Sequence, residues 1–395
     1  MRIVAIREAT MPIGTAMRNA VISFQSMTAS ALAIITDRVV DGAPIIGYAF
    51  DSIGRYGKGG LLRERFIPRL LAAVPESLLS ADGLIDPELC WRVAMTDEKD
   101  GGHGERPGAV GLLDAALWDV LAKAKGQPLW RTLADRYGTT GAGPQIQSYG
   151  SCGHFQADGN AGKLRDEVAR ARDLGYRTIK IKVDGRDLRG DASRIEAALA
   201  VLPAAADLAV DANGKADVDD LRWMQTVAGY GLAWIEEPAS PLDYAGLARL
   251  ASDCAVPVAT GENLFSWDDA RNLLRYGGLR PARDRIQVDM LLAYGIPEYR
   301  RILSGFEAAG WQRSAFWPHA GHLFAAHVVA GLGLGSQEAA PDADRVYGGF
   351  WDGTAITNGQ LCIPDIPGVG YEAKANLYGV LRELALDVNA PLRSN

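Results

Sequence analysis

Ionisable side chains recur at regular intervals in the second half of the chain. Each one ends or follows a short apolar run of strand length, and helical patterns separate these runs. In chain order these residues are Lys182, Asp211, Glu236, Glu262, Asp289, His319 and Glu338. A single acid after a strand is often only the N-cap of the next helix. That explanation does not account for the whole series, so we interpret these residues as parts of one site.

Two lysines share one face of the strand expected at Thr178–Lys182. The run Thr178-Ile-Lys-Ile-Lys182 alternates with period two, which places Lys180 and Lys182 on the same side. Exposed edge strands often carry such lysines, whereas a strand inside a barrel buries them. A lysine acts as a base near neutral pH only if its pKa falls from about 10.4, and burial and nearby positive charge lower it.

Three of the acids have the spacing of successive βα units. Asp211, Glu236 and Glu262 are 25 and 26 residues apart (236 − 211 and 262 − 236). Converging carboxylates repel one another unless a cation lies between them. Oxygen-only ligation favours Mg²⁺, with Mn²⁺ as a possible substitute. Glu237 competes with Glu236, but only the residue in register with the other ligands can bind the ion.

The segment Pro318-His-Ala-Gly-His322 offers two histidines, and His327 follows further along the predicted helix. We interpret His319 as a general acid oriented by Asp289, because a carboxylate on one ring nitrogen fixes the tautomer and raises the pKa. His322 is then structural. A zinc cluster of His319, His322 and His327 is the competing interpretation, but the HxH of metal-dependent hydrolase barrels does not follow the first strand.

The elements that must position these residues form two modules. Gly138 to Pro144 reads as a linker between a first module with α+β order and a region of βα alternation. We therefore expect an α+β capping domain over residues 1–137, a barrel over 138–346 and a returning segment over 347–395. The expected barrel strands are Gln145–Tyr149, Thr178–Lys182, Leu208–Asp211, Ala233–Glu236, Val256–Thr260, Arg285–Val288, Arg313–Trp317 and Gly333–Gln337.

Composition narrows the class of partner. Lys and Arg number 41 against 48 Asp and Glu, a formal net charge of −7, which gives no electrostatic basis for binding nucleic acid or anionic membranes. No apolar run approaches the roughly 18 residues that span a bilayer, and Arg7 and Glu8 interrupt the place of a signal peptide. Cys90, Cys152, Cys254 and Cys362 form no CxxC pair. We expect a cytoplasmic protein with a small-molecule substrate.

The chain contains a KxK strand, the motifs DxN (Asp211–Asn213), EEP (Glu236–Pro238) and GEN (Gly261–Asn263), a later Asp289 and His319. Taken together, these residues resemble the mandelate racemase subgroup of the enolase superfamily. The resemblance implies a (β/α)7β barrel under a capping domain. It implies Mg²⁺ on Asp211, Glu236 and Glu262, and removal of a proton α to a carboxylate to give a metal-bound enediolate. The implied catalytic residues are Lys182 as base with Lys180 beside it, His319 with Asp289 as a dyad, and Glu338 as the acid that hydrogen-bonds the enolate oxygen.

Within this subgroup, several segments are similar to the D-tartrate dehydratase family. They are Arg18–Ala20, Arg55–Gly57, Gly101–Arg106, Pro241–Tyr244, Ala259–Ser266 and Asp269–Gly278. The similarity implies that Lys182 takes the proton, that His319 protonates the departing hydroxyl, and that the enol tautomerises to oxaloacetate. The expected substrate-binding residues are Asn19, Tyr56 and Lys99 at the distal end, together with Lys180 and Glu338.

The same residues are compatible with other activities. A racemase or epimerase would also use Lys182 and His319 as two bases. A cycloisomerase is less favoured, because that branch of the superfamily carries a second lysine where this chain has Asp289. A non-catalytic binding barrel would be expected to lack at least one ligand or base, and none is missing. We also expect a homo-oligomer.

Overall fold

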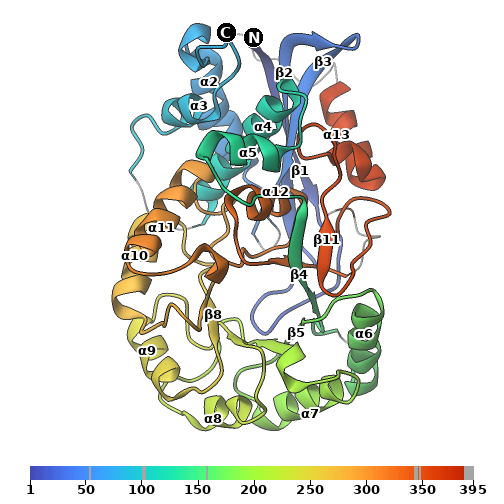
Figure 1. Ribbon diagram of the computed structural model, residues 1–395, viewed down its shortest axis with the longest axis vertical. Coiled ribbons are helices and arrows are strands. Elements are labelled where there is room, and N and C mark those ends of the chain that lie inside the picture. Colours follow the sequence, from blue (N-terminus) through green and yellow to red (C-terminus); the bar gives the residue numbers. More distant parts are fainter. Residues whose placement is uncertain (53–54, 100–103, 157–158, 342–345, 347, 387–395) are drawn as a thin grey trace.

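The computed structural model describes residues 1–52, 55–99, 104–156, 159–341, 346 and 348–386. Residues 101–103 of the segment Gly101–Arg106 lie outside this part of the chain. The described part of the chain forms two sheets: a three-stranded antiparallel sheet that includes the N-terminal strand, and a curled, largely parallel sheet below it (Figure 1).

The first module is an antiparallel meander covered by helices. Its strands are β1 (Ile3–Pro12), β2 (Thr28–Val40) and β3 (Ala43–Phe50), in that order. Gly47 lets β3 approach helix α4 (Glu105–Ala124) closely, since a Cβ there would lie 2.3 Å from the carbonyl oxygen of Ala116. The helical segments are α1 (Gly59–Leu61), η1 (Leu62–Phe66), α2 (Ile67–Ala72), η2 (Pro75–Leu78), α3 (Pro87–Ala94), α4 (Glu105–Ala124) and α5 (Leu129–Tyr137).

The second module is the curled parallel sheet with helices outside it. In spatial order its strands are β10 (Gln337–Ala339), β4 (Gln145–Cys152), β5 (Ile179–Lys182), β6 (Leu208–Asp211), β7 (Ile235–Glu236), β8 (Val258–Thr260) and β9 (Arg285–Ile286). The helical segments are α6 (Ala161–Asp173), α7 (Leu188–Leu199), η3 (Ala205–Asp207), α8 (Arg222–Ala228), α9 (Tyr244–Asp253), α10 (Trp267–Tyr276), α11 (Ile296–Ala308), η4 (Arg313–Ala315) and α12 (Leu323–Leu332). This arrangement confirms the predicted barrel with a capping domain.

The prediction of a seventh barrel strand at Arg313–Trp317 is wrong. Residues Arg313–Ala315 form the 3₁₀ turn η4, and only Phe316 makes a parallel bridge, to Ile286 of β9. The amide of Gly335 donates to the carbonyl of Phe316 at 3.0 Å. Phe316 alone therefore takes the place of the seventh strand, between β9 and the segment before β10, because the chain turns on both sides of this residue.

The last strand lies later in the chain than its predicted range of Gly333–Gln337. Gly333 adopts a positive φ of 69° and ends helix α12, and the amide of Leu334 still bonds back to Val329. The strand β10 therefore begins at Gln337. As a result Glu338 lies within the strand rather than after it.

The end of the described chain contacts both modules. Strand β11 (Gln360–Cys362) pairs antiparallel with β4 of the barrel, and after turn η5 (Tyr371–Ala373) helix α13 (Ala375–Leu386) packs against β1 and β2. The domain limits at residues 137 and 346 stay a prediction. Among the described residues, no helix combines the length and the apolar character needed to cross a membrane.

Candidate active site

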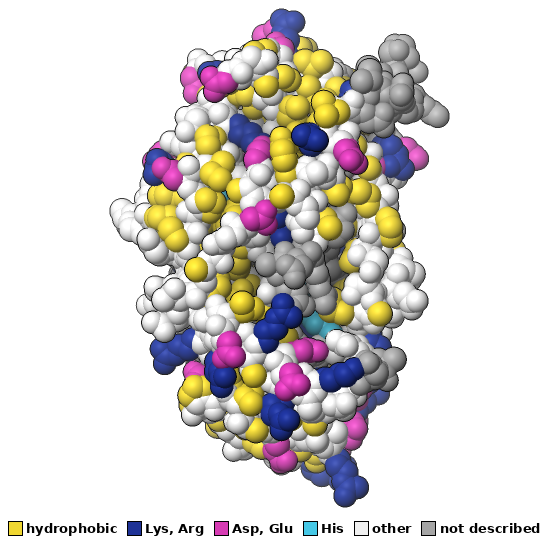
Figure 2. Space-filling model, turned by 90° about the vertical axis from the view of Figure 1, so that its right-hand side faces the viewer, with side chains coloured by type: hydrophobic (Ala, Val, Ile, Leu, Met, Phe, Trp, Pro, Cys, Tyr) yellow, Lys and Arg dark blue, Asp and Glu magenta, His cyan; other side chains and the backbone are white. Residues whose placement is uncertain are grey.

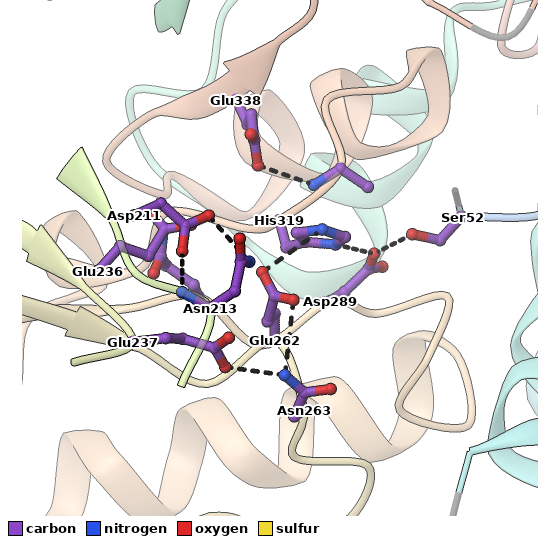
Figure 3. Close-up of polar contacts among 12 residues, drawn as sticks. Ser52, Asp211, Asn213, Glu236, Glu237, Glu262, Asn263, Asp289, His319 and Glu338 are labelled. Atoms are coloured by element: carbon purple, nitrogen blue, oxygen red, sulfur yellow. Dashed lines mark hydrogen bonds and ion pairs between the residues drawn. The ribbon is translucent and has the colours of Figure 1, made fainter. Parts of the chain in front are cut away.

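Strand register brings the base strand and two acids together. In the parallel ladder Lys182 of β5 is paired with Asp211 of β6, and Asp211 is paired with Glu236 of β7. Glu262 follows β8. Asp211, Glu236 and Glu262 are buried, and each offers an oxygen within 4.8 Å of those of the other two. This set of hard oxygen donors is suited to Mg²⁺, and Figure 3 shows the three carboxylates converging.

Further polar groups orient the three carboxylates. Asn213 donates to Asp211 from its backbone amide at 2.8 Å and from its side chain at 3.2 Å. On Glu236, Oε2 accepts hydrogen bonds from Gln287 Nε2 at 2.6 Å and from Trp234 Nε1 at 3.2 Å. These contacts leave few orientations for either ligand, which prepares the group for an ion.

Glu237 lies beside the three carboxylates and is not one of them. Its φ of 40° is in the left-handed region, so the chain turns directly after Glu236. Asn263 Nδ2 donates to Glu237 at 2.8 Å and approaches Glu262 at 3.5 Å (Figure 3). Burial, together with the charge of Glu262, raises the pKa of Glu237 well above its usual value. The choice of Glu236 over Glu237 agrees with this geometry.

The two lysines are held by carboxylates. Lys182 Nζ forms an ion pair with Asp211, and Lys180 Nζ forms one with Glu236 and a second, at 2.9 Å, with Glu338. Burial has the largest single effect on Lys182 and lowers its pKa, but Asp211, Glu338 and Glu262 together outweigh burial, and the net pKa is raised. The carboxylates and lysines of the site therefore do not by themselves give Lys182 the lowered pKa that a lysine base needs.

Glu338 lies on the opposite side of the site from Glu237. Its carboxylate accepts a hydrogen bond from the amide of Ala320 at 3.2 Å, as Figure 3 shows. Burial raises the pKa of Glu338, but Lys180, His319 and Lys182 together outweigh burial and lower it. The predicted role as a hydrogen-bond donor needs the protonated form, which these cations disfavour.

His319 lies between two carboxylates and lines the same site. Its Nδ1 is 3.3 Å from Asp289 Oδ2, and its Nε2 is 3.5 Å from Glu262 Oε2. Burial lowers the pKa of His319, but Glu262 and the hydrogen bond to Asp289 outweigh burial and raise the pKa to about 9. The raised pKa favours the protonated imidazole, which is the form that a general acid requires.

The other two histidines are not metal ligands. In His327, Nδ1 accepts from the amide of Trp130 at 3.1 Å and Nε2 lies 3.1 Å from the carbonyl of Val369, which fixes a neutral ring. His322 is buried between Phe50 and Phe324. The one metal-binding group found among the described residues is the three carboxylates. The alternative of a three-histidine zinc cluster is therefore wrong.

A cavity of about 790 Å³ opens above these residues. Its barrel side includes Ser151, Lys182, Asn213, Glu262, His319 and Glu338. Its other side is mostly apolar and comes from the connection between β1 and β2, residues 13–27, which we call the capping loop. Figure 2 shows charged side chains of both signs scattered over one face, without a large patch of one sign.

The predicted substrate-binding residues divide into two groups around this cavity. Asn19 and Glu338 line it. Tyr56 and Lys99 are exposed and are not among the described residues that line it. Lys180 is fully buried and is not among them either. The structure thus brings Asn19 to the site and leaves Tyr56 and Lys99 outside the described wall.

Three groups at the site were not anticipated from the sequence. Ser52 donates to Asp289, Arg55 lines the cavity and donates to Asn263 Oδ1 at 2.5 Å, and Gln287 holds Glu236. Arg55 and Asn263 fall within segments singled out by resemblance, which is the only signal that could have found them. Ser52 and Gln287 carry no local pattern that predicts these contacts.

Comparison with known families decides the relationship of the chain. The family model described as enolase C-terminal domain-like matches residues 163–377, more than half of the chain. The chain belongs to the enolase superfamily.

Curated relatives of this superfamily member differ in their reactions. It is 29% identical over 356 residues to a 3,6-anhydro-alpha-L-galactonate cycloisomerase from Streptomyces coelicolor, covering 85% of this chain and 88% of the relative. It is 26% identical to an arabinonate dehydratase from Saccharolobus solfataricus, covering 80% and 81%. An L-talarate/galactarate dehydratase from Salmonella typhimurium is 28% identical, with 70% and 65% covered.

Solved structures show the same fold. The crystal structure of a racemase from Streptomyces coelicolor A3(2) with bound magnesium superposes with a TM-score of 0.75 at 24% identity, covering 96% of this chain and 98% of that chain. The structure of L-talarate/galactarate dehydratase from Salmonella typhimurium LT2 gives a TM-score of 0.70 at 22% identity, covering 92% and 87%. The fold of this enolase-superfamily member is thus common to enzymes of several reactions.

Proposed function

We propose that the protein is a Mg²⁺-dependent dehydratase of a hydroxy diacid or acid sugar. The observation that carries the proposal is the placement of two proton-transfer groups around the three carboxylates that would bind the metal. Lys182 contacts Asp211, His319 contacts Glu262, and both line the same cavity. A base and an acid that contact different carboxylates of the metal group can act on neighbouring carbons of one bound substrate.

The carboxylates of Asp211, Glu236 and Glu262 fit the metal. All three are buried and close together, and Lys180 and Lys182 supply positive charge against them. When bound there, Mg²⁺ would stabilise the negative charge that proton removal leaves on the substrate and would compete with Lys182 for Asp211, which lowers the pKa of that lysine. Mn²⁺ is the expected substitute.

The chain's own residues supply the proton transfers. Lys182 Nζ removes the proton α to the substrate carboxylate, and Lys180 beside it disfavours an added positive charge on Lys182. His319 donates a proton to the departing hydroxyl, so that water leaves. Asp289 holds the imidazole through Nδ1, which keeps Nε2 directed toward the ligand side of the cavity.

D-Tartrate is the specific substrate that we propose, with oxaloacetate as the product after the enol tautomerises. The segments similar to D-tartrate dehydratases support it, and Asn19 and Arg55 in the cavity wall provide polar groups for the distal end. The relatives named as arabinonate and L-talarate/galactarate dehydratases support dehydration of a polyhydroxy acid as the reaction class.

The test is proton NMR in D₂O of Mg²⁺-loaded protein with a panel of hydroxy diacids and acid sugars. Formation of oxaloacetate or its decarboxylation product from D-tartrate supports the specific proposal. Dehydration of a different acid keeps the reaction and changes the substrate. If the protein neither dehydrates an acid of the panel nor exchanges an α proton with solvent, the proposed function is wrong.

A racemase or epimerase is the second candidate, because the same placement of Lys182 and His319 serves two-base proton transfer. Deuterium incorporation with inversion and without loss of water would favour it. Asp289 in place of a second lysine still disfavours a cycloisomerase, although two relatives are named as cycloisomerases. The cytoplasmic location and the homo-oligomeric state stay predictions.

A further inference from the structure

The ladder between β4 and β5 ends immediately before Lys182. Its last paired residues are Cys152 and Ile181, and the next residues along the two strands are Gly153 and Lys182. On the other side of β5 the pairing continues, since the amide of Val183 donates to the backbone carbonyl of Asp211 at 2.9 Å. The backbone that carries Lys182 therefore has strand support on one side only.

Arg194 of helix α7 binds the backbone on the side where the ladder between β4 and β5 ends. Its Nε donates to the carbonyl of Lys182 at 2.9 Å, and its Nη2 donates to the carbonyl of Gly153. One planar guanidinium thus joins the two carbonyls at the place where the ladder stops. Because the donors of arginine are fixed in one plane, this bridge sets the spacing of the two strand ends, which a single ammonium group could not do.

The same guanidinium also contacts the segment on which the capping loop rests. Its central carbon lies 4.5 Å from the centre of the Phe155 ring. Phe155 forms an antiparallel bridge with Arg18 of the capping loop, through amide-to-carbonyl bonds of 2.8 and 3.3 Å. Arg194 is therefore in contact with the base strand on one side and with the support of the cavity roof on the other.

We propose that Arg194 is a positioning residue that couples the capping loop to Lys182. Seating of the capping loop over a substrate is transmitted through Phe155 and Arg194 to the carbonyl of Lys182, which sets the base against the α carbon. The catalytic part of this inference rests on the proposed function. The structural part, a guanidinium bridge between the loop support and the base strand, does not.

The test replaces Arg194 with alanine and then restores a guanidinium from solution. A hollow of about 280 Å³ is lined by Arg194, Phe155 and Arg18, which gives a small cation space to enter. Since a displacement of about 1 Å can cost about 10²-fold in rate, we expect Arg194→Ala to slow α-proton exchange by about tenfold to a hundredfold. Methylguanidinium should restore much of this loss, whereas methylammonium should not.

Arg186→Ala is the matched control. Arg186 is exposed in the same β5–α7 connection and also donates to a backbone carbonyl, that of Lys215 at 2.8 Å, but it has no contact with Lys182 or Phe155. This variant should keep the wild-type exchange rate and should not respond to methylguanidinium. Mg²⁺ affinity, measured by calorimetry, should be unchanged in both variants because neither arginine bonds a carboxylate of the metal group.

Amide hydrogen exchange of the substrate-free proteins tests the structural part separately. Arg194→Ala should speed exchange at residues 149–156 and in the capping loop. The inference is overturned if exchange in both segments matches the wild type, or if α-proton exchange is slowed but methylguanidinium restores nothing. If the wild-type protein exchanges no α proton at all, the proposed function fails, and the amide data alone decide whether the bridge exists.

Discussion

The hydroxyl of Ser52 donates a 2.5 Å hydrogen bond to Oδ2 of Asp289, the same oxygen that lies 3.3 Å from Nδ1 of His319 (Figure 3). Ser52 follows β3 of the first module, while Asp289 follows β9 of the barrel. Asp289 Oδ1 accepts from the amide of Leu291 at 2.8 Å, so both of its oxygens are held. The capping domain therefore takes part in orienting the proposed acid.

Ser52→Ala should slow dehydration while leaving α-proton exchange by Lys182 near the wild-type rate. A hydrogen bond to a charged group contributes about 1.5–3 kcal/mol, so we expect a loss of about 10- to 100-fold in the dehydration step. Both rates can be followed in one NMR time course in D₂O. Equal losses in both rates would show that Ser52 acts on the whole site and not on the dyad.

His319→Asn should block dehydration and preserve α-proton exchange. An asparagine cannot supply the proton that the leaving hydroxyl needs, and such acid catalysis contributes about 10²–10⁴-fold. His322→Asn serves as a second variant, because His322 is buried beside the dyad without lining the cavity. If His319→Asn dehydrates at the wild-type rate, the division of roles is wrong.

Lys182→Ala should remove both activities, by about 10²–10⁴-fold, because it deletes the base of the first step. Mg²⁺ binding should persist, since the three carboxylates stay in place. Lys125→Ala, at an exposed helix end, is the matched control and should behave as the wild type. Retention of α-proton exchange in Lys182→Ala would mean that another group is the base.

Removal of metal should abolish turnover, and Mg²⁺ or Mn²⁺ should restore it. Glu262→Gln should weaken Mg²⁺ binding in calorimetry by more than the roughly 10–100-fold typical of residues outside the ligand set. Asp220→Asn, at a partly exposed acid that does not line the cavity, should leave affinity unchanged. A chelated sample that turns over at full rate would contradict the metal assignment.

His327 should make stability depend on pH. Burial lowers the pKa of His327 from 6.5 to about 3. Between these two pH values the unfolded chain therefore binds more protons at this residue than the folded protein does. Stability is therefore lost as the pH falls below 6.5, by about 2 kcal/mol between pH 7 and pH 5. Urea unfolding of His327→Gln should show a smaller difference between these two pH values than the wild type does. An unchanged difference would show that His327 is not buried as a neutral ring.

The site could be predicted from the sequence to the extent that it depends on strand order. Parallel strands in βα alternation end at one edge, so acids spaced by one βα unit meet there. This reasoning placed Asp211, Glu236 and Glu262 together, and period-two alternation correctly put Lys180 and Lys182 on one face. Strand ends were less predictable: at Phe316 a single bridge replaces a strand, because turns on both sides override the local pattern.

Contacts across the two modules were decided only by the tertiary structure. Ser52 and Asp289 are 237 residues apart, and Arg18 meets Phe155 across the same division. No local periodicity encodes such pairs, because they depend on how the capping domain packs on the barrel. The sequence by itself thus determined which ionisable groups lie together at the candidate site, through residue type and βα spacing. The packing of the two modules decided which side chains orient those groups and which form the wall facing the substrate.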